Sequence, residues 1–574
     1  MSSRRAWLRL LSAGGAFAAC RPGPSDLPSG TDRWHPYAGG LADLLIVGGT
    51  IWTMDPEHPE VGAVAARGGR IIAIGDPAHL THLHGPRTRV LDLGGGFAVP
   101  GLTDAHAHLV GLGAELDEVD LRGATSIDDA IDRVRSSAPP TGWVLGRGWD
   151  QNLWPGAAMP THDLLSAAFP DRPVWLRRID GHAGWANLAA LKVAGITATT
   201  TPPQGGEITL RDGPQGREPT GLLVDAAMEL VPVPRPDRDT LRRRILAAQA
   251  RVLPLGLTGV HEMGVSQDAH ATLRALASAD ELKLRITAYA DEDWFVRQLR
   301  HNQPERFGPD PRYALVGVKL YVDGALGSRG AALLAPYDDR PGHTGALQHT
   351  AAQLADLVTT ATRGGWQVAA HAIGDRAIRE LLDTLEALPR QLVPARNREL
   401  QTDPRLRVEH AQIVDLADIP RFARLGAVAS MQPTHATSDM AWVPARIGAA
   451  RLPGAYAWRR FLAAGVPLAL GSDFPVEQPN PTHGLHAAIT RQDSHGQPAG
   501  GWLPDQRLSL WQAVAGFTTG AAYAARQEHW RGRLSPGMAA DLTCFRDDLR
   551  ELAPLALRDA PVLATVVGGR VVWE

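Results

Sequence analysis

His106 and His108 are the first residues of the sequence whose type and spacing could support chemistry. They end a short apolar stretch with the character of a β-strand, and residues i and i+2 of a strand point to the same side. Both imidazoles could therefore reach one metal ion. Because His-x-His pairs are common by chance, the weight of this pair depends on what else the fold places beside it.

Four more side chains able to bind metal ions lie late in other apolar stretches. They are Lys319, His371, His410 and Asp473. Each of them alone could be a satisfied polar residue of a protein core. Together with His106 and His108 they form an ordered set spread over the ends of separate strands, and such a set predicts one shared metal site.

The elements that must position this set alternate short buried strands with amphipathic helices, which is typical of a parallel α/β fold. Helices are expected over residues 350–363 and 376–388, for example. Eight parallel strands with helices between them predict a (β/α)8 TIM barrel, whose active sites lie at the carboxyl ends of the strands. The strands are expected near residues 98–106, 257–263, 284–290, 315–322, 367–373, 405–411, 427–432 and 467–473.

The chain ends and the long gap after the first strand predict further units. Residues 42–99 and 530–574 carry short strands with tight turns, and neither end has enough strands for a sandwich of its own. We therefore expect one small β-sandwich domain built from both ends, with the barrel (100–529) inserted into it. The gap after the first strand is too long for one crossover and predicts an inserted subdomain at about residues 115–235.

The first forty residues have the pattern of an export signal followed by a tether. Residues 1–20 combine Arg4 and Arg5 with a short apolar run and small residues before Cys20. The two arginines resemble a twin-arginine signal, and the segment before Cys20 resembles a lipobox that makes this cysteine a lipid attachment site. Residues 21–40 are expected to be a disordered tether. We thus expect a protein exported to the periplasm or cell envelope, held to the membrane by a lipid on Cys20.

Composition excludes several classes of function. The chain has 574 residues and a net charge of −3, so it lacks the global positive field that attracts nucleic acid. Two cysteines exclude both a disulfide framework and a cysteine-rich zinc site. Of 58 basic residues only three are lysines, namely Lys192, Lys283 and Lys319. A function that needs an amine therefore has three internal candidates.

The ordered ligand set resembles that of the metal-dependent amidohydrolase superfamily. Three segments are similar to its amidohydrolase family 3 branch, the YtcJ-like group that includes N-substituted formamide deformylases. These segments are 148–152 (GWDQN), 178–183 (RIDGHA) and 318–324 (VKLYVDG). The segment 532–542 is similar to the superfamily's return into its small β domain.

The resemblance implies two divalent metal ions bridged by a carbamylated Lys319. His106, His108 and Asp473 would hold one ion, and His371 and His410 the other. Imidazole and carboxylate-type ligands without thiolate suit zinc, with manganese, cobalt and iron as alternatives. Asp473 would be catalytic by taking a proton from water and giving it to the leaving nitrogen, so the expected reaction is hydrolysis of a non-peptide C–N bond.

Several neighbouring residues are candidates for roles around this centre. His182 is a catalytic candidate that would contact the substrate carbonyl. Candidate substrate-binding residues are Trp149, Asp150, Asp180 and His435. Glu409 is adjacent to His410 and therefore faces the other side of its strand, where a packing or supporting role is expected. His261 and Glu262 also face opposite ways, which argues against a metal-binding pair.

Two alternatives remain open at this stage. A mononuclear deaminase of the same superfamily would lack the bridging lysine, and a catalytically inactive lipoprotein would only bind ligands. The expected partners are a small amide-like molecule and a second copy of the chain in a homodimer, with no nucleic acid. A membrane is expected to be contacted only through the lipid on Cys20.

Overall fold

The computed structural model describes residues 40–179, 181, 183–203, 206–214, 216–305, 312–388 and 405–574, and its centre is a barrel. Eight parallel strands form one nearly closed sheet, which confirms the predicted TIM barrel. In the order of the sheet these are β8 (Leu102–Ala107), β15 (Leu257–Val265), β16 (Arg285–Ala290), β17 (Tyr313–Tyr321), β18 (Gln367–Ala372), β19 (Arg407–His410), β20 (Val428–Met431) and β21 (Leu468–Leu470).

The first and last barrel strands meet through hydrogen bonds beyond their ladders. The backbone amide of Asp473 donates to the carbonyl of His106 (2.7 Å). The Asp104 carboxylate accepts from the amide (3.0 Å) and the hydroxyl (2.6 Å) of Ser472. The point where the barrel closes is therefore also the point where two candidate ligands meet.

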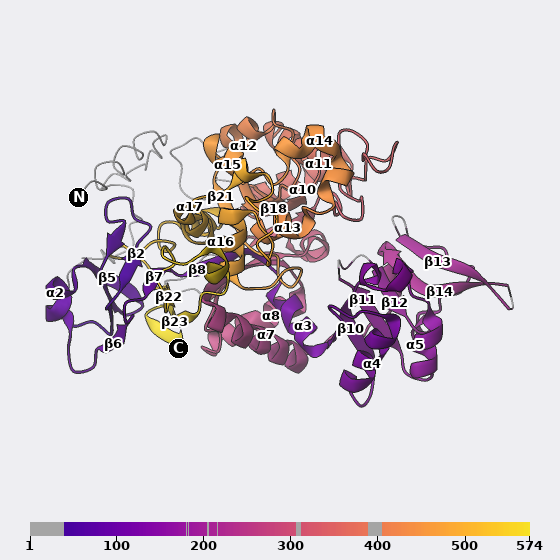
Figure 1. Ribbon diagram of the computed structural model, residues 1–574, viewed down its shortest axis with the longest axis horizontal. Coiled ribbons are helices and arrows are strands. Elements are labelled where there is room, and N and C mark those ends of the chain that lie inside the picture. Colours follow the sequence, from indigo (N-terminus) through magenta and orange to yellow (C-terminus); the bar gives the residue numbers. More distant parts are fainter. Residues whose placement is uncertain are drawn as a thin grey trace.

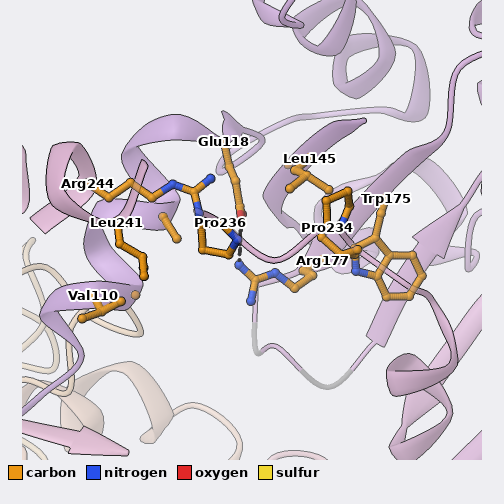
Figure 2. Close-up of a pocket in the computed structure, with 13 residues that line it drawn as sticks. Val110, Glu118, Leu145, Trp175, Arg177, Pro234, Pro236, Leu241 and Arg244 are labelled. Carbon is orange, nitrogen blue, oxygen red and sulfur yellow. Dashed lines mark hydrogen bonds and ion pairs between the residues drawn. The ribbon is translucent and has the colours of Figure 1, made fainter. Parts of the chain in front are cut away.

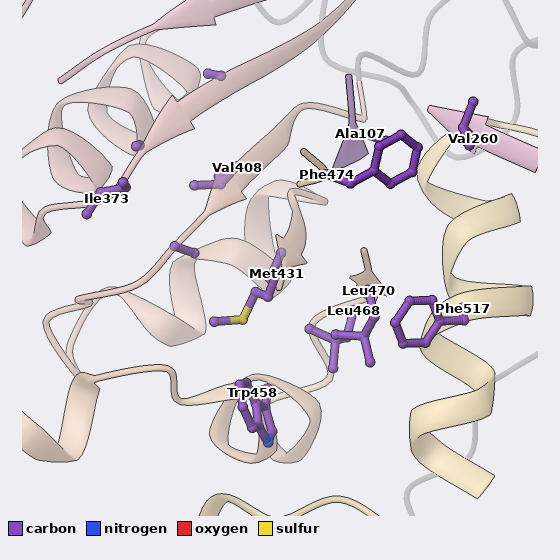
Figure 3. Packing of buried hydrophobic residues seen from close by; sticks show 14 of the residues in the cluster. Ala107, Val260, Ile373, Val408, Met431, Trp458, Leu468, Leu470, Phe474 and Phe517 are labelled. Atoms are coloured by element: carbon purple, nitrogen blue, oxygen red, sulfur yellow. The ribbon is translucent and has the colours of Figure 1, made fainter. Parts of the chain in front are cut away.

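Helices cover the outside of the barrel and fill the space around it. They include α7 (Arg238–Val252), α8 (Gln267–Ser278), α10 (Ala351–Arg363) and α11 (Asp375–Glu386). Thr350 caps α10 with a capping box that also uses Gln353. Figure 3 shows Phe517 of the helical segment η9 (Gly516–Gly520) packed towards Leu470 of β21, while Val408 of β19 also lies in this apolar layer. The residues on either side of Val408 face the barrel interior.

Both chain ends form a β domain on one side of the barrel (Figure 1). Strand β22 (Leu542–Phe545) pairs antiparallel with β7 (Phe97–Pro100), so the two ends share one sheet and a common apolar core. The remaining strands of this six-stranded sheet are β24 (Arg570–Trp573), β23 (Val562–Val567), β2 (Thr50–Trp52) and β3 (Glu60–Val61). A four-stranded sheet contains β5 (Arg70–Gly75), β4 (Ala63–Arg67), β1 (Leu44–Val47) and β6 (Arg89–Asp92).

The predicted first barrel strand is corrected at its beginning. Residues 98–100 belong to β7 of the terminal domain, and the barrel strand begins at Leu102. Gly101 separates the two because a Cβ there would lie 2.3 Å from the Thr258 hydroxyl of the neighbouring barrel strand. One apolar stretch of the sequence thus serves two sheets.

The insertion lies on the other side of the barrel, between α3 (Leu109–Asp117) and α7 (Figure 1). Its sheet is parallel along one half and antiparallel along the other. The strand order is β13 (Gly206–Gly213), β14 (Gly216–Asp225), β12 (Ala183–Ala186), β11 (Val174–Arg178), β10 (Val144–Trp149) and β9 (Val119–Asp120). Trp149, Trp154 and Trp185 pack together in its core beside α4 (Ile127–Ser137) and α5 (His162–Ala168). Among the described helices, none is both long and apolar enough to span a bilayer.

Candidate metal centre

His106 and His108 present their Nε2 atoms to the same carboxylate. His106 Nδ1 donates to the Glu409 carboxylate (2.6 Å), and His108 Nδ1 donates to the carbonyl of Met263 (2.9 Å). Because these oxygens only accept, each ring carries its proton on Nδ1 and leaves Nε2 with a lone pair. The two Nε2 atoms lie 3.5 Å and 3.1 Å from Oδ1 of Asp473. Nitrogen lone pairs and a carboxylate oxygen repel one another at such distances, so this arrangement is stable when a cation lies between them.

Asp473 is held in place by its backbone at the end of the barrel. Its φ of 62° lies in the left-handed region, which aims the side chain back across the strand ends. An ionised carboxylate in this position can bind a metal ion or accept a proton.

The ends of β17, β18 and β19 bring Lys319, His371 and His410 to the same place. The ring centroids of His371 and His410 are 4.6 Å apart, and those of His106 and His410 are 4.7 Å apart. Burial and then the charge of Lys319 lower the pKa of His106 to about 4 and that of His371 to about 3. These imidazoles are neutral at neutral pH, which is the form that binds metal ions.

Lys319 is buried beside these imidazoles. Its Nζ lies 4.4 Å from the centroid of the Tyr321 ring. Within the described part of the chain, no carboxylate or carbonyl forms an ion pair or hydrogen bond with this amine. A buried ammonium without an anionic partner is costly, which favours covalent modification of this side chain.

A buried arginine–glutamate pair supports the ligands from inside the barrel. Arg407 Nε donates to Glu409 Oε1 (2.7 Å), while the other carboxylate oxygen holds His106. Arg407 also contacts His261 Nδ1 (2.8 Å) and the Tyr289 hydroxyl (3.0 Å). Glu409 therefore has a supporting role, and His261 belongs to this layer rather than to the ligand cluster.

Two buried carboxyls next to the centre, Asp104 and Glu262, were not among the predicted functional residues. Asp104 accepts from the His106 amide (3.1 Å) and from Ser472, and burial raises its pKa to about 7. Glu262 accepts from the amides of Leu109 and Val110 at the start of α3, and burial raises its pKa to about 7 as well. Both position the segments that carry ligands. Asp104 could have been found, since it precedes His106 by two residues and so shares its strand face.

His435 joins the cluster from α13 (Pro433–Asp439), as a neighbour of the expected ligands. Its Nε2 lies 3.8 Å from Oδ2 of Asp473, and its ring stacks on that of His410 at 6.0 Å. Two groups in the described chain have ligand atoms within 4.8 Å of one another: His106, His108 and Asp473, and His410, His435 and Asp473. The second group contains His435 where the resemblance implied His371.

The predicted substrate-binding role of Trp149 is corrected by its position. The ring is fully buried in the core of the insertion, and its Nε1 donates to the carbonyl of Leu176 (2.8 Å). Asp150 remains partly accessible and pairs with Arg178 (2.9 Å). Asp180 and His182 lie outside the described residues, as do Arg4, Arg5 and Cys20 of the predicted export signal.

The donor set fits divalent metal ions. His106 Nε2 and Asp473 Oδ1 are buried and have no hydrogen-bond partner among the described residues. Imidazole nitrogens and carboxylate oxygens are ligands that zinc and related divalent ions prefer. Fold and site together define a metal-dependent hydrolase of the TIM-barrel type.

Comparison with known proteins gives the family. The model of the amidohydrolase family matches residues 89–573. The chain is similar to Protein LONG AFTER FAR-RED 3 of Arabidopsis thaliana, with 35% identity over 94% of this chain and 93% of that protein. It is also similar to the putative amidohydrolase YtcJ of Bacillus subtilis (strain 168), with 33% identity over 92% and 98% of the two chains.

Two further similarities concern activity and fold. An N-substituted formamide deformylase of Arthrobacter pascens is 29% identical over 93% of this chain and 99% of its own length. The crystal structure of an uncharacterized metal-dependent hydrolase from Pyrococcus horikoshii has a TM-score of 0.73 and 27% identity, covering 92% of this chain and 99% of that one. The chain belongs to the amidohydrolase family, and the prediction of a hydrolase acting on non-peptide C–N bonds is confirmed.

Proposed function

We propose that the protein is an exported amidohydrolase that cleaves a small amide-like substrate with two divalent metal ions, zinc in the first instance. The observation that carries the proposal is the orientation of His106 and His108, whose Nε2 lone pairs face Oδ1 of Asp473 at 3.5 Å and 3.1 Å. Such an arrangement of two imidazoles and one carboxylate suits a cation. Metal ions held there supply Lewis-acid activation of water and of the substrate carbonyl.

Different residues of the chain transfer protons and position the substrate. Asp473 is anionic and accepts a proton from water, then donates it to the leaving nitrogen as the C–N bond breaks. His435 Nε2 lies 3.8 Å from Oδ2 of Asp473, where it can donate to the carbonyl oxygen of a bound amide. His182 and Asp180 are further proposed contacts of the substrate, together with Asp150.

Lys319 is proposed to carry a carbamate, which would supply oxygen ligands to the divalent metal ions. The neutral amine attacks carbon dioxide, an N–C bond forms and one proton leaves, so the site gains an anion with two oxygens. The unpartnered burial of Lys319 beside His106 and His371 supports this modification. Arginine stays protonated under these conditions and cannot form the carbamate.

An N-substituted formamide is the proposed substrate type. The similarity to the Arthrobacter pascens deformylase supports this substrate type.

Export and assembly are separate proposals. Export by a twin-arginine route, a lipid on Cys20 and a homodimer rest on the sequence and its resemblance alone. Replacement of Arg4 and Arg5 by lysine should stop export, and unchanged export would exclude the twin-arginine route.

Metal analysis of the purified protein tests the proposed centre. We expect about two zinc ions per chain and hydrolysis of N-substituted formamides in preference to cyclic amides and lactones. Lys319→Arg keeps the positive charge and should abolish both the second metal ion and activity. Lys319→Ala should be inactive and partly rescued by short carboxylic acids. One metal ion per chain together with a fully active Lys319→Ala protein would refute the bridged centre.

A further inference from the structure

A cavity of about 360 Å³ lies at the boundary between the barrel and the insertion. Figure 2 shows Val110, Leu241 and Arg244 on one side of it, and Leu145 and Trp175 on the other. The first group comes from α3 and α7 of the barrel, and the second from β10 and β11 of the insertion. Its volume is within the range of small-molecule sites, which is about 300–1,000 Å³.

The cavity begins next to the metal centre. Helix α3 follows His108 directly, so Val110 and Gly111 of the cavity wall are neighbours of a candidate ligand. A Cβ at Gly111 would lie 3.2 Å from Cβ of His108 and 3.5 Å from Cδ of Pro475, so a side chain there would stand between ligands and cavity. The His108 side chain is 29% exposed, against 0% for His106 and 10% for Asp473. Within the cluster, His108 is thus the ligand most accessible from outside, and it directly precedes the helix that forms one wall of the cavity.

The lining is apolar, and its charges are already neutralised within the protein. The Nη2 atom of Arg177 contacts both carboxylate oxygens of Glu118, at 3.1 Å and 3.0 Å. Arg244 Nε pairs with Asp117 at 2.8 Å. A charged ligand group would have to compete with these pairs, whereas an apolar group would gain by leaving water.

We propose that this cavity binds a neutral apolar substituent, about the size of a phenylalkyl group, on the amide that the metal centre cleaves. The inference rests on the proposed amidohydrolase function and names the substrate class of that same site. The substrate would then be selected where α3 and the insertion line the same cavity. Binding of a remote group in this cavity would hold the amide against Asp473.

Two cavity-filling variants test the inference from different walls. Ala114→Phe fills the cavity from α3, and Val233→Trp fills it from the segment that returns to the barrel. We expect each to lower kcat/KM for N-(2-phenylethyl)formamide by about tenfold or more and to leave N-methylformamide within about twofold. Leu116→Phe is the matched control, because Leu116 is on the same helix but exposed to solvent. This variant should leave kcat/KM unchanged for both formamides.

Calorimetric binding to the Asp473→Asn protein separates this inference from the proposed function. If N-(2-phenylethyl)formamide binds and Ala114→Phe weakens it about tenfold, the cavity assignment stands even when no amide is hydrolysed. If amides are hydrolysed but both formamides react equally in the wild type and in both filling variants, the cavity assignment is overturned and the function stands. Preference for N-formylphenylalanine, which adds a carboxylate to the same skeleton, would overturn the neutral character of the site.

Discussion

Two buried arginine–carboxylate pairs lie at opposite ends of the barrel and have the same geometry. Arg407 Nε is 2.7 Å from Glu409 near the metal centre, and Arg285 Nε is 2.7 Å from Asp541 where the barrel meets the terminal β domain. All four side chains are buried. What differs is the partner of the second carboxylate oxygen.

In the first pair that oxygen accepts from Nη2 of Arg407 (3.3 Å) and from His106, so the pair fixes the tautomer of a candidate ligand. In the second pair it accepts from Arg285 again (3.0 Å) and from the amide of Gly568 (2.8 Å), so it ties strands of the terminal domain to the barrel. The same ion pair therefore supports chemistry at one end and domain attachment at the other. The contacts of the second oxygen decide which.

Arg407→Met should have the largest effect, because it breaks the pair that supports a ligand. It leaves Glu409 buried without its cation, which we expect to cost about 3–5 kcal/mol of the free energy of unfolding. Metal affinity should also fall, by roughly 10–100-fold, since His106 loses its fixed acceptor. Urea unfolding and zinc titration against a competing chelator measure the two effects. Unchanged zinc affinity would contradict the supporting role.

Asp541→Asn breaks the other pair and should affect stability alone. Arg285 loses its anion, and we expect the free energy of unfolding to fall by about 3 kcal/mol. Zinc affinity and kcat should stay within about twofold of the wild type, because no ligand is attached to this pair. A loss of zinc affinity like that of Arg407→Met would show that the two ends of the barrel are not independent.

Acid should weaken the Asp541 pair in a defined pH range. Burial raises the pKa of Asp541, but Arg285 outweighs it and brings the pKa from 3.8 to about 2. A depressed pKa contributes stability above the unfolded-state value, and this contribution is lost as the pH falls from about 4 towards 2. The difference in unfolding free energy between the wild type and Asp541→Asn should shrink by roughly 2 kcal/mol over that range. A difference that stays constant would contradict this assignment.

An exposed pair should have the smallest effect. Arg135 and Asp132 on α4 are 3.1 Å apart, with side chains that are 58% and 71% exposed. Solvent screens such a pair, so Asp132→Asn should change the free energy of unfolding by less than about 0.5 kcal/mol. Thermal or urea unfolding measures it. A loss comparable to that of Asp541→Asn would mean that burial does not explain the strength of the two barrel pairs.

The barrel could be predicted because each strand is a short apolar run, and the ligands because each stands at the end of one. Arg407 could not, since an arginine inside a barrel makes sense only with Glu409, His261 and Tyr289 around it. His261 and Tyr289 come from strands that are distant in sequence. Only the shared face of Arg407 and Glu409, two residues apart, carried a signal.

Trp149 lies on the opposite face of its strand from Leu145 for a local reason. Leu145 of the same strand faces the cavity, and simple alternation would put Trp149 on that face too. The pairing of β10 with β11 shifts between Arg147 and Trp149, where Gly148 has a φ of 102°. This irregularity turns the indole into the core of the insertion. A sequence pattern does not reveal such a shift.

The closure of the barrel by Asp104, Ser472 and Asp473 determines when the candidate metal centre can form during synthesis of the chain. His106 leaves the ribosome long before Asp473, by roughly 20–70 seconds at about 5–20 residues per second. Throughout that interval the early ligands lack the segment that buries them, and β7 lacks its partner β22 until later still. A nascent chain therefore carries His106 and His108, two of the six candidate ligands, without the segment that closes the barrel over them, and the complete candidate centre can form only near the end of translation.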